Sequence, residues 1–195
     1  MIGDVINHGK KPYWDPAKSH HYHATLRAGE ETLEASLVRV LLRTVASSKS
    51  VDADAFRDDY VKFMQTPGSH NDSYASTAHR MFFANLFHKQ KPVKDCPDND
   101  AHNVDTIDGL VLPSVAAACA AYQGGPGAEG KAAARDAAVA VAATTRASRP
   151  LASAAAALGD AMHGAIHGVG SAALRVDAMA SALGMRVPRQ PTMVS

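Results

Sequence analysis

The sequence predicts an all-α protein, a compact orthogonal bundle of about seven helices, and three observations lead to this prediction. Apolar residues recur at intervals of three and four positions through most of the chain, the spacing that places them on one helix face. No segment combines alternating polarity with the β-branched residues typical of a strand. Alanine is abundant, and aromatic residues make up only 6% of the 195 residues, a composition that suits closely packed helices.

The chain divides into three parts. Residues 1–29 are expected to be an irregular N-terminal segment, because glycine and proline punctuate them. Residues 30–184 are expected to form a single helical domain, long enough for one sizeable core. Residues 185–195 are expected to be a loose tail, since Pro188 and Pro191 fall within it.

Three helices are predicted in the first half of the domain, each from a stripe of apolar residues. Leucine and valine recur every four residues from Leu33 to Val45, which marks one face of a long helix. Asp52 precedes the second stripe and is suited to cap a helix start. The predicted helices cover residues 30–47, residues 53–66, and a stretch from Asp72 or Ser73 to about His88.

Four helices are predicted in the second half, which is rich in alanine. Pro113 falls inside the first of them, so we expect a kink or a break there. Pro150 suits the first turn of the third, because a proline needs no hydrogen-bond partner in that position. The predicted helices cover residues 106–122, 128–146, 150–163 and 171–184.

Charge and cysteine content exclude several classes of partner. The net charge is only +1, which gives no electrostatic basis for binding nucleic acid or an anionic membrane. No run of 18 apolar residues is present, so no membrane-spanning helix is expected. Cys96 and Cys119 form neither a disulfide framework nor a zinc motif. A reducing compartment, the cytoplasm, is therefore the expected location.

The most informative stretch is the acidic segment 96–108, CPDNDAHNVDTID. Its four aspartates are hard oxygen donors, which suit Mg²⁺ or Ca²⁺. The glycine and the closing glutamate of a calcium-binding EF-hand loop are absent, so that motif is excluded. The stretch ends where a helix is predicted to begin, and free N–H groups at a helix start can hold a phosphate or a ribose hydroxyl. The alternative is a polar loop that Asp105 or Thr106 caps.

Two histidine groups and the cysteines are weaker candidates for chemistry. The cluster from His20 to His23 could bind a metal, but a surface loop explains it as well, because no acidic residue lies at ligand spacing. Asp160, His163 and His167 could share one helix face, whereas the neighbouring glycines favour close helix packing. Cys96 lies in an acidic loop, which disfavours a thiolate, and Cys119 is expected to be buried and inert.

Two stretches together resemble a known family. They are residues 71–85, NDSYASTAHRMFFAN, and residues 98–108, DNDAHNVDTID. Both are similar to the ADP-ribosylglycohydrolase superfamily, especially to its divergent branch with the J1-type crystallins and selenoprotein J. The similarity covers about residues 20–165. It implies an all-α fold, a pair of Mg²⁺ ions in a cleft, and hydrolysis of a glycosidic bond to ADP-ribose.

The resemblance also implies a set of site residues. Asp105 and Asp108 would be catalytic. The metal ligands would be Glu30, Glu31, Asp105 and Asp108. The residues around an ADP-ribosylated substrate or free ADP-ribose would be Asn71, Asp72, Asn99, His102 and Asn103.

The chain departs from the family pattern at both ends of the domain. The active branches carry a Thr-Asp-Asp-Thr motif before their long first helix, where this chain reads RAGEET over residues 27–32. No Gly-Asp-x-Asp-Thr motif follows residue 165. The chain therefore resembles part of such a domain, and two alternatives stay open. One is a non-enzymatic, crystallin-like structural protein that kept the fold. The other is a helical homo-oligomerisation module that uses the surface of residues 159–184.

Overall fold

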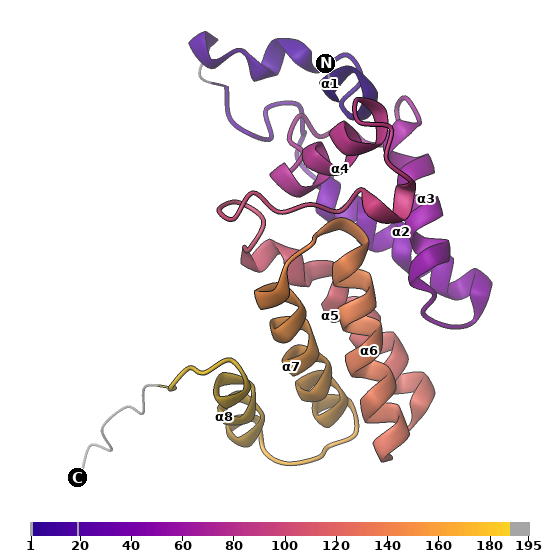
Figure 1. Cartoon of the computed structure of the whole chain (residues 1–195), viewed down its shortest axis with the longest axis vertical. Helices are drawn as coiled ribbons and strands as arrows, with labels where there is room; N and C mark the ends of the chain where they lie inside the picture. Colours follow the sequence, from indigo (N-terminus) through magenta and orange to yellow (C-terminus); the bar gives the residue numbers. More distant parts are fainter. Residues whose placement is uncertain (1, 19, 188–195) are drawn as a thin grey trace.

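The computed structural model describes residues 2–18 and 20–187, and these form a bundle of eight α-helices without a strand. The all-α prediction is therefore confirmed. Helices α1–α4 group at one end, and α5, α6 and α7 lie side by side at the other (Figure 1). Their bounds are α1 Ile2–Ile6, α2 Leu33–Ser48, α3 Ala53–Gln65, α4 Thr77–Phe87, α5 Val111–Gly124, α6 Ala128–Thr145, α7 Arg149–Ile166 and α8 Ala172–Ala182.

Helix α2 begins three residues later than the sequence predicts. Thr32 caps it, because the Thr32 Oγ1 accepts a hydrogen bond from the Ala35 N–H at 3.4 Å. Glu30 and Glu31 therefore lie in the preceding loop, while Glu34 stands in the first helical turn. The sequence-based expectation that the helix includes the first two glutamates is wrong.

Helix α4 also begins later than predicted, at Thr77 rather than at Asp72 or Ser73. The Asp72 carboxylate does cap a helix start, but it caps that of α2, accepting a hydrogen bond from the Leu33 N–H at 2.9 Å. The segment from Asn71 to Ser76 consequently remains a loop beside the start of α2.

The predicted helix 106–122 consists of two pieces. A 3₁₀ turn, Ile107–Leu110, comes first, and α5 follows it. Pro113 is the third residue of α5, so it lies in the first turn, where its missing N–H leaves no bond unmade. The expected break is therefore the start of the helix, and the acidic segment stays outside α5.

The core has an aromatic part and an alanine part. Phe56, Tyr60, Phe82 and Phe83 join α3 to α4 and are fully buried. Small residues join α5, α6 and α7, and Gly159 permits a close approach of α7 to α6: a Cβ built there would lie 2.6 Å from the Arg135 Cα. Helix α7 extends to Ile166, past the predicted end at residue 163.

Residues 2–29, expected to be irregular, carry α1 and two 3₁₀ turns, Lys11–Trp14 and Pro16–Lys18. Polar bonds fasten this segment to the loop before α4. The Trp14 Nε1–H donates to the Ser73 carbonyl oxygen at 2.6 Å, and the Asn7 amide donates to the Asp72 carbonyl oxygen at 3.2 Å. The N-terminal segment is thus packed against the rest of the domain.

Helix α8 contacts the bundle through α7 and contains no buried residue. Leu174 and Val176 remain exposed, and the predicted homo-oligomer through residues 159–184 stays a prediction. Of the expected loose tail, residues 188–195 lie outside the described part of the chain. Within that described part, every helix is too short or too polar to cross a membrane.

Candidate functional site

Two adjoining cavities lie where the N-terminal segment, the starts of α2 and α4, and the acidic segment meet. The first, here called the carboxylate cavity, has a volume of about 420 Å³. The second, the aromatic cavity, has a volume of about 540 Å³. Tyr74, Thr77 and Asn103 line both, so the two cavities share a wall.

The carboxylate cavity gathers acidic, hydroxyl and amide groups from five segments. Its three lining carboxylates come from α2, from the loop before α4 and from the 3₁₀ turn before α5. The lining residues are His23, Thr32, Leu33, Glu34, Asp72, Tyr74, Ser76, Thr77, Asn103, Thr106 and Asp108.

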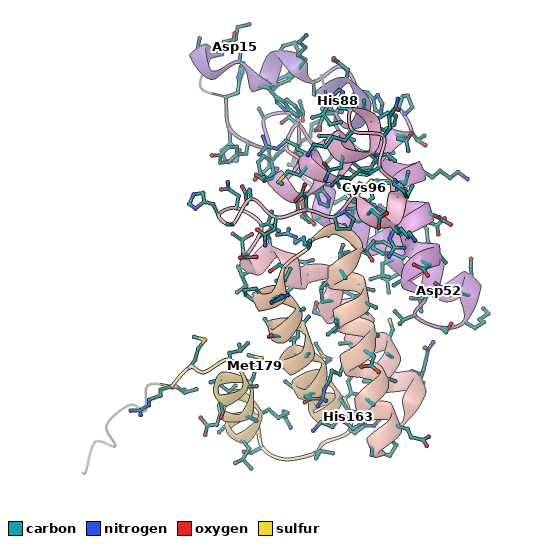
Figure 2. The ribbon with its side chains drawn as sticks, in the orientation of Figure 1. Asp15, Asp52, His88, Cys96, His163 and Met179 are labelled. Carbon is teal, nitrogen blue, oxygen red and sulfur yellow. The ribbon has the colours of Figure 1, made fainter. Side chains whose placement is uncertain are left out.

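The aromatic cavity combines flat rings with one cation. Tyr13, Trp14 and Tyr22 come from the N-terminal segment, and Arg80 comes from α4. The Tyr22 and Tyr74 rings lie 5.1 Å apart. Figure 2 shows Asp15, another lining residue, on the N-terminal segment at the far end from α5–α7. Such rings can stack on a heterocycle while the guanidinium binds an anion.

Glu34 is the carboxylate of α2 that reaches the first cavity. It accepts a hydrogen bond from His79 Nε2 at 3.0 Å, and His79 Nδ1 contacts the Tyr60 hydroxyl at 2.8 Å. Burial raises the pKa of Glu34, but the charge and hydrogen bond of His79, together with the charge of Arg146, outweigh it. The pKa of Glu34 therefore lies below its usual value, and the side chain is ionised at neutral pH.

Asp108, predicted to be catalytic and a metal ligand, lines the same cavity. Its carboxylate accepts a hydrogen bond from the Arg146 guanidinium at 2.6 Å and another from the Thr106 hydroxyl. Burial raises the pKa of Asp108, but these two bonds and the arginine charge lower it by more. Arg146 also donates to the Val104 carbonyl oxygen at 2.9 Å, so it fastens the acidic segment to the bundle.

Asp72, predicted to bind substrate, lines the carboxylate cavity with its acceptors already in use. One carboxylate oxygen lies 2.9 Å from His23 Nδ1 and also accepts a bond from the Tyr74 N–H. The other caps α2 through Leu33. The residue is 1% exposed, and its position organises the cavity wall.

Asp105, predicted to be catalytic and a metal ligand, is exposed and does not belong to the lining of either cavity. It accepts a hydrogen bond from the Asn99 amide at 2.9 Å. His102 is also exposed, and it lines neither cavity. Asn103 alone of the predicted residues lines both, with its amide bonded to Asp100 at 2.8 Å. The Asn103 hydrogen bond, with backbone N–H groups, lowers the pKa of Asp100 to about 2.

Glu30 and Glu31, the other predicted metal ligands, lie at a separate surface hollow together with Asn71. Glu30 accepts bonds from the Arg27 N–H and the Asn71 amide, both at 2.8 Å. Glu31 pairs with Arg39 at 2.6 Å.

The four predicted magnesium ligands are thus spread over different sites. In residues 2–18 and 20–187, no three or more histidine, cysteine, aspartate or glutamate side chains come together as metal ligands would. The residues present do not fit the expected Mg²⁺ pair.

The histidine candidates of α7 serve helix packing. His163 Nε2 lies 3.1 Å from the Gly125 carbonyl oxygen, and His167 Nε2 lies 2.9 Å from that of Ala121. Asp160 pairs with Arg135 at 2.6 Å. Figure 2 places His163 near the end of the α5–α7 group, away from the N-terminal segment that lines the aromatic cavity.

The cysteines carry no reactive thiolate. Burial raises the pKa of Cys96 and of Cys119. Cys96 is buried, in line with a structural role, whereas Cys119 is only half-buried, so the expectation of full burial is wrong for it.

Sequence reasoning missed Glu34, His79, Tyr60 and Arg146. Glu34 follows Glu30 and Glu31, which the resemblance favours as metal ligands. Only the position of the Thr32 cap places Glu34, and not those two, in the first turn of α2. His79 and Tyr60 lie on apolar helix faces, a position that predicts core residues. Arg146 lies 38 residues from Asp108, so no local spacing connects them.

Comparison of the chain with protein-family models, with curated proteins and with solved structures gave no match. The observations that bear on function are therefore the fold, the two cavities and the resemblance of the two polar stretches.

Proposed function

We propose that the protein binds ADP-ribose, free or attached to a substrate, across the two cavities and hydrolyses its glycosidic bond. The observation that carries this proposal is the shared wall of Tyr74, Thr77 and Asn103 between an aromatic cavity and a carboxylate cavity. ADP-ribose consists of an adenine, a first ribose, a pyrophosphate and a terminal ribose, in that order. A stacking site, a cation and a polar pocket match its base, its pyrophosphate and its terminal ribose.

Each part of the ligand has a chemically suitable wall. Tyr13, Trp14 and Tyr22 offer ring faces for the adenine. Arg80 offers two parallel N–H donors for a phosphate. Hydroxyl and amide groups of Thr77 and Asn103 lie on the shared wall, where a ribose would bind.

The carboxylate cavity suits the chemistry of glycosidic bond cleavage. The transition state of that reaction resembles an oxocarbenium ion, so positive charge develops on the sugar ring. Asp108 and Glu34 are ionised groups of the same cavity, and negative charge facing the ring would stabilise it. Because the predicted magnesium ligands are dispersed, these two side chains would supply the charge stabilisation.

Matched aspartate variants test the proposal. We expect wild-type protein to bind ADP-ribose in calorimetry and to release ADP-ribose from an ADP-ribosylated peptide. Asp108→Asn should lower the release rate about tenfold or more, since it removes a charge at the cavity. Asp105→Asn removes the same charge outside the cavity and should leave the rate close to that of the wild type.

The opposite pattern would shift the assignment. If Asp105→Asn abolished the release and Asp108→Asn did not, the sequence-based catalytic residue would be right and the cavity wrong. Absence of binding heat and of released product in the wild type would overturn the proposed function itself.

One observation favours the second candidate, a non-enzymatic, crystallin-like structural protein. Several predicted site carboxylates are held by structural partners: Asp108 by Arg146, Glu31 by Arg39, and Asp72 by the start of α2. The same calorimetry separates the two candidates, because a purely structural protein would give no heat with ADP-ribose.

A further inference from the structure

A chain of three polar side chains runs from the aromatic core to the carboxylate cavity. Tyr60 of α3 is fully buried, His79 of α4 is 1% exposed, and the Glu34 side chain of α2 is 26% exposed. The Tyr60 hydroxyl lies 2.8 Å from His79 Nδ1, and His79 Nε2 lies 3.0 Å from Glu34 Oε1. Only the carboxylate end of this chain reaches the cavity.

The surroundings show that this chain is more than core packing. The Tyr60 ring lies 5.2 Å from Phe82 and 5.5 Å from Phe83. A phenylalanine would fill this aromatic site without a polar atom to satisfy, and burying an unbonded hydroxyl or imidazole carries a free-energy cost. Both groups are bonded only because each has the next as its partner, so the bonds form one connected unit.

The hydrogen-bond pattern fixes where the histidine proton lies. Burial raises the pKa of Tyr60 well above its usual value, so the phenol stays protonated. An ionised Glu34 only accepts hydrogen bonds, so His79 Nε2 must carry a proton toward it. In neutral His79, Nδ1 then accepts the Tyr60 O–H. In protonated His79, both ring nitrogens donate. The neutral form with its proton on Nδ1 would leave the Glu34 contact without a hydrogen.

We propose that Glu34 is a ligand-binding carboxylate for vicinal hydroxyl groups, such as those of a ribose, and that His79 and Tyr60 are its positioning residues. The hydrogen bond from His79 Nε2 occupies Oε1. It fixes the plane of the carboxylate and directs the remaining acceptor sites at the cavity. A carboxylate fixed in this way accepts bonds from sugar hydroxyls without first losing rotamer freedom.

Three groups from other elements supply the charge around Glu34. His79 and Arg146 face it with positive or donor groups, and Asp108 adds a negative charge from the 3₁₀ turn before α5. Tyr60 touches it only through His79. The neighbouring Glu31 belongs to a different surface, where Arg39 holds it. Glu31 therefore serves as the matched control for Glu34.

The positioning part has a ligand-free test. Nitrogen NMR of labelled protein reports which ring nitrogen of His79 carries the proton, a signal that packing alone does not determine. We expect the Nε2 of His79 to be protonated in the wild type. In Glu34→Leu, which removes the acceptor that faces Nε2, we expect the proton to be shared between Nδ1 and Nε2, because the Tyr60 hydroxyl can donate to Nδ1 or accept from it. An unprotonated Nε2 in the wild type, or an unchanged pattern in the variant, would overturn the positioning roles.

The binding part rests on the proposed function for its ligand, ADP-ribose, and is measured by calorimetry. Glu34→Gln should weaken binding about tenfold or more, because hydrogen bonds to charged groups contribute strongly. Tyr60→Phe should weaken it by a smaller factor, and Glu31→Gln should leave it unchanged. If wild-type protein binds ADP-ribose and Glu34→Gln binds it equally well, the role of Glu34 is overturned and the proposed function is not. Failure of wild-type protein to bind ADP-ribose overturns the proposed function and the ligand assignment, while the NMR result still decides the positioning roles.

Discussion

Single polar residues decide how the acidic segment and the helix starts come together in this protein. Asp72 caps α2 across 39 residues of sequence and also contacts His23. Arg146 holds Asp108 and the Val104 carbonyl oxygen at once. Each residue satisfies groups from two distant segments, and each would leave buried polar atoms unpaired if it were replaced by an apolar residue.

The depressed pKa of Glu34 predicts a pH dependence of stability. A carboxylate whose pKa is lower in the folded state stabilises the fold above its unfolded pKa, near 4.5. That contribution is lost as the pH falls through the folded pKa. Urea unfolding should therefore show Glu34→Gln to be less stable than wild type by about 1 kcal/mol at pH 7. The two proteins should converge in acid. A difference in the free energy of unfolding that grows in acid would contradict this assignment.

At the residue scale, the sequence supports some site residues and misses others for physical reasons. Asp108 and Asn103 could be found because they belong to a dense polar stretch. Asp105 looked equivalent to Asp108 in that stretch, yet only Asp108 lies within reach of Arg146. Local composition does not say which of two aspartates faces a cavity, since a partner far along the chain decides it.

At the scale of elements, helix propensity and apolar spacing predict the helices well, and caps decide their ends. Helix α3 begins at the predicted residue, because Asp52 accepts bonds from the Asp54 and Ala55 N–H groups, and it ends one residue before the predicted end. Helices α2 and α4 begin later than predicted, since Thr32 caps α2 and the Asp72 carboxylate is used at α2 rather than at α4. A cap that comes from another segment is invisible to a reading of adjacent residues.

The contact between α6 and α7 predicts a strong effect of a very small substitution. In Gly159→Ala, the added methyl group would meet the Arg135 Cα at 2.6 Å and the Ala134 carbonyl oxygen at 2.8 Å. These are backbone atoms that cannot rotate away. Overpacking of this kind costs about 1–3 kcal/mol, and the better helix propensity of alanine offsets up to about 1 kcal/mol.

Thermal unfolding followed by circular dichroism measures this effect, and we expect a clear fall in Tm for Gly159→Ala. Ser153→Ala is the control, because Ser153 is an exposed residue of the same helix. That variant should keep the wild-type Tm or raise it slightly. A Gly159→Ala protein as stable as the wild type would show that α6 and α7 can move apart at little cost.

At the scale of the whole molecule, the all-α class follows from composition and periodicity, whereas the cavities follow from the packing of distant segments. The N-terminal segment was expected to be irregular, but Trp14 and Asn7 fasten it to the loop before α4. It thereby supplies one wall of the aromatic cavity. Glycine and proline content predicts where regular helices are absent, and it does not predict which surface a segment covers.

The response of the whole domain to added ligands distinguishes the predicted magnesium site from the cavity proposal. A ligand that binds only the folded state raises Tm by mass action. We expect ADP-ribose to raise Tm and MgCl₂ alone to leave it unchanged, because the predicted ligands Glu30, Glu31, Asp105 and Asp108 do not come together. A rise with MgCl₂ that Asp108→Asn removes would restore the sequence-based metal site.

The fastening of the acidic segment by Arg146 has a consequence for protein engineering. Asp98 pairs with the backbone at Arg146, and the Val104 carbonyl oxygen bonds to the Arg146 side chain. Both ends of the turn between them are therefore anchored, while Ala101 at its tip is exposed with a φ of 58°. Ala101→Cys would place one thiol on this exposed tip without lengthening the turn across which Asp100 bonds to Asn103. That position is therefore suited to attaching a fluorescent reporter close to the cavities.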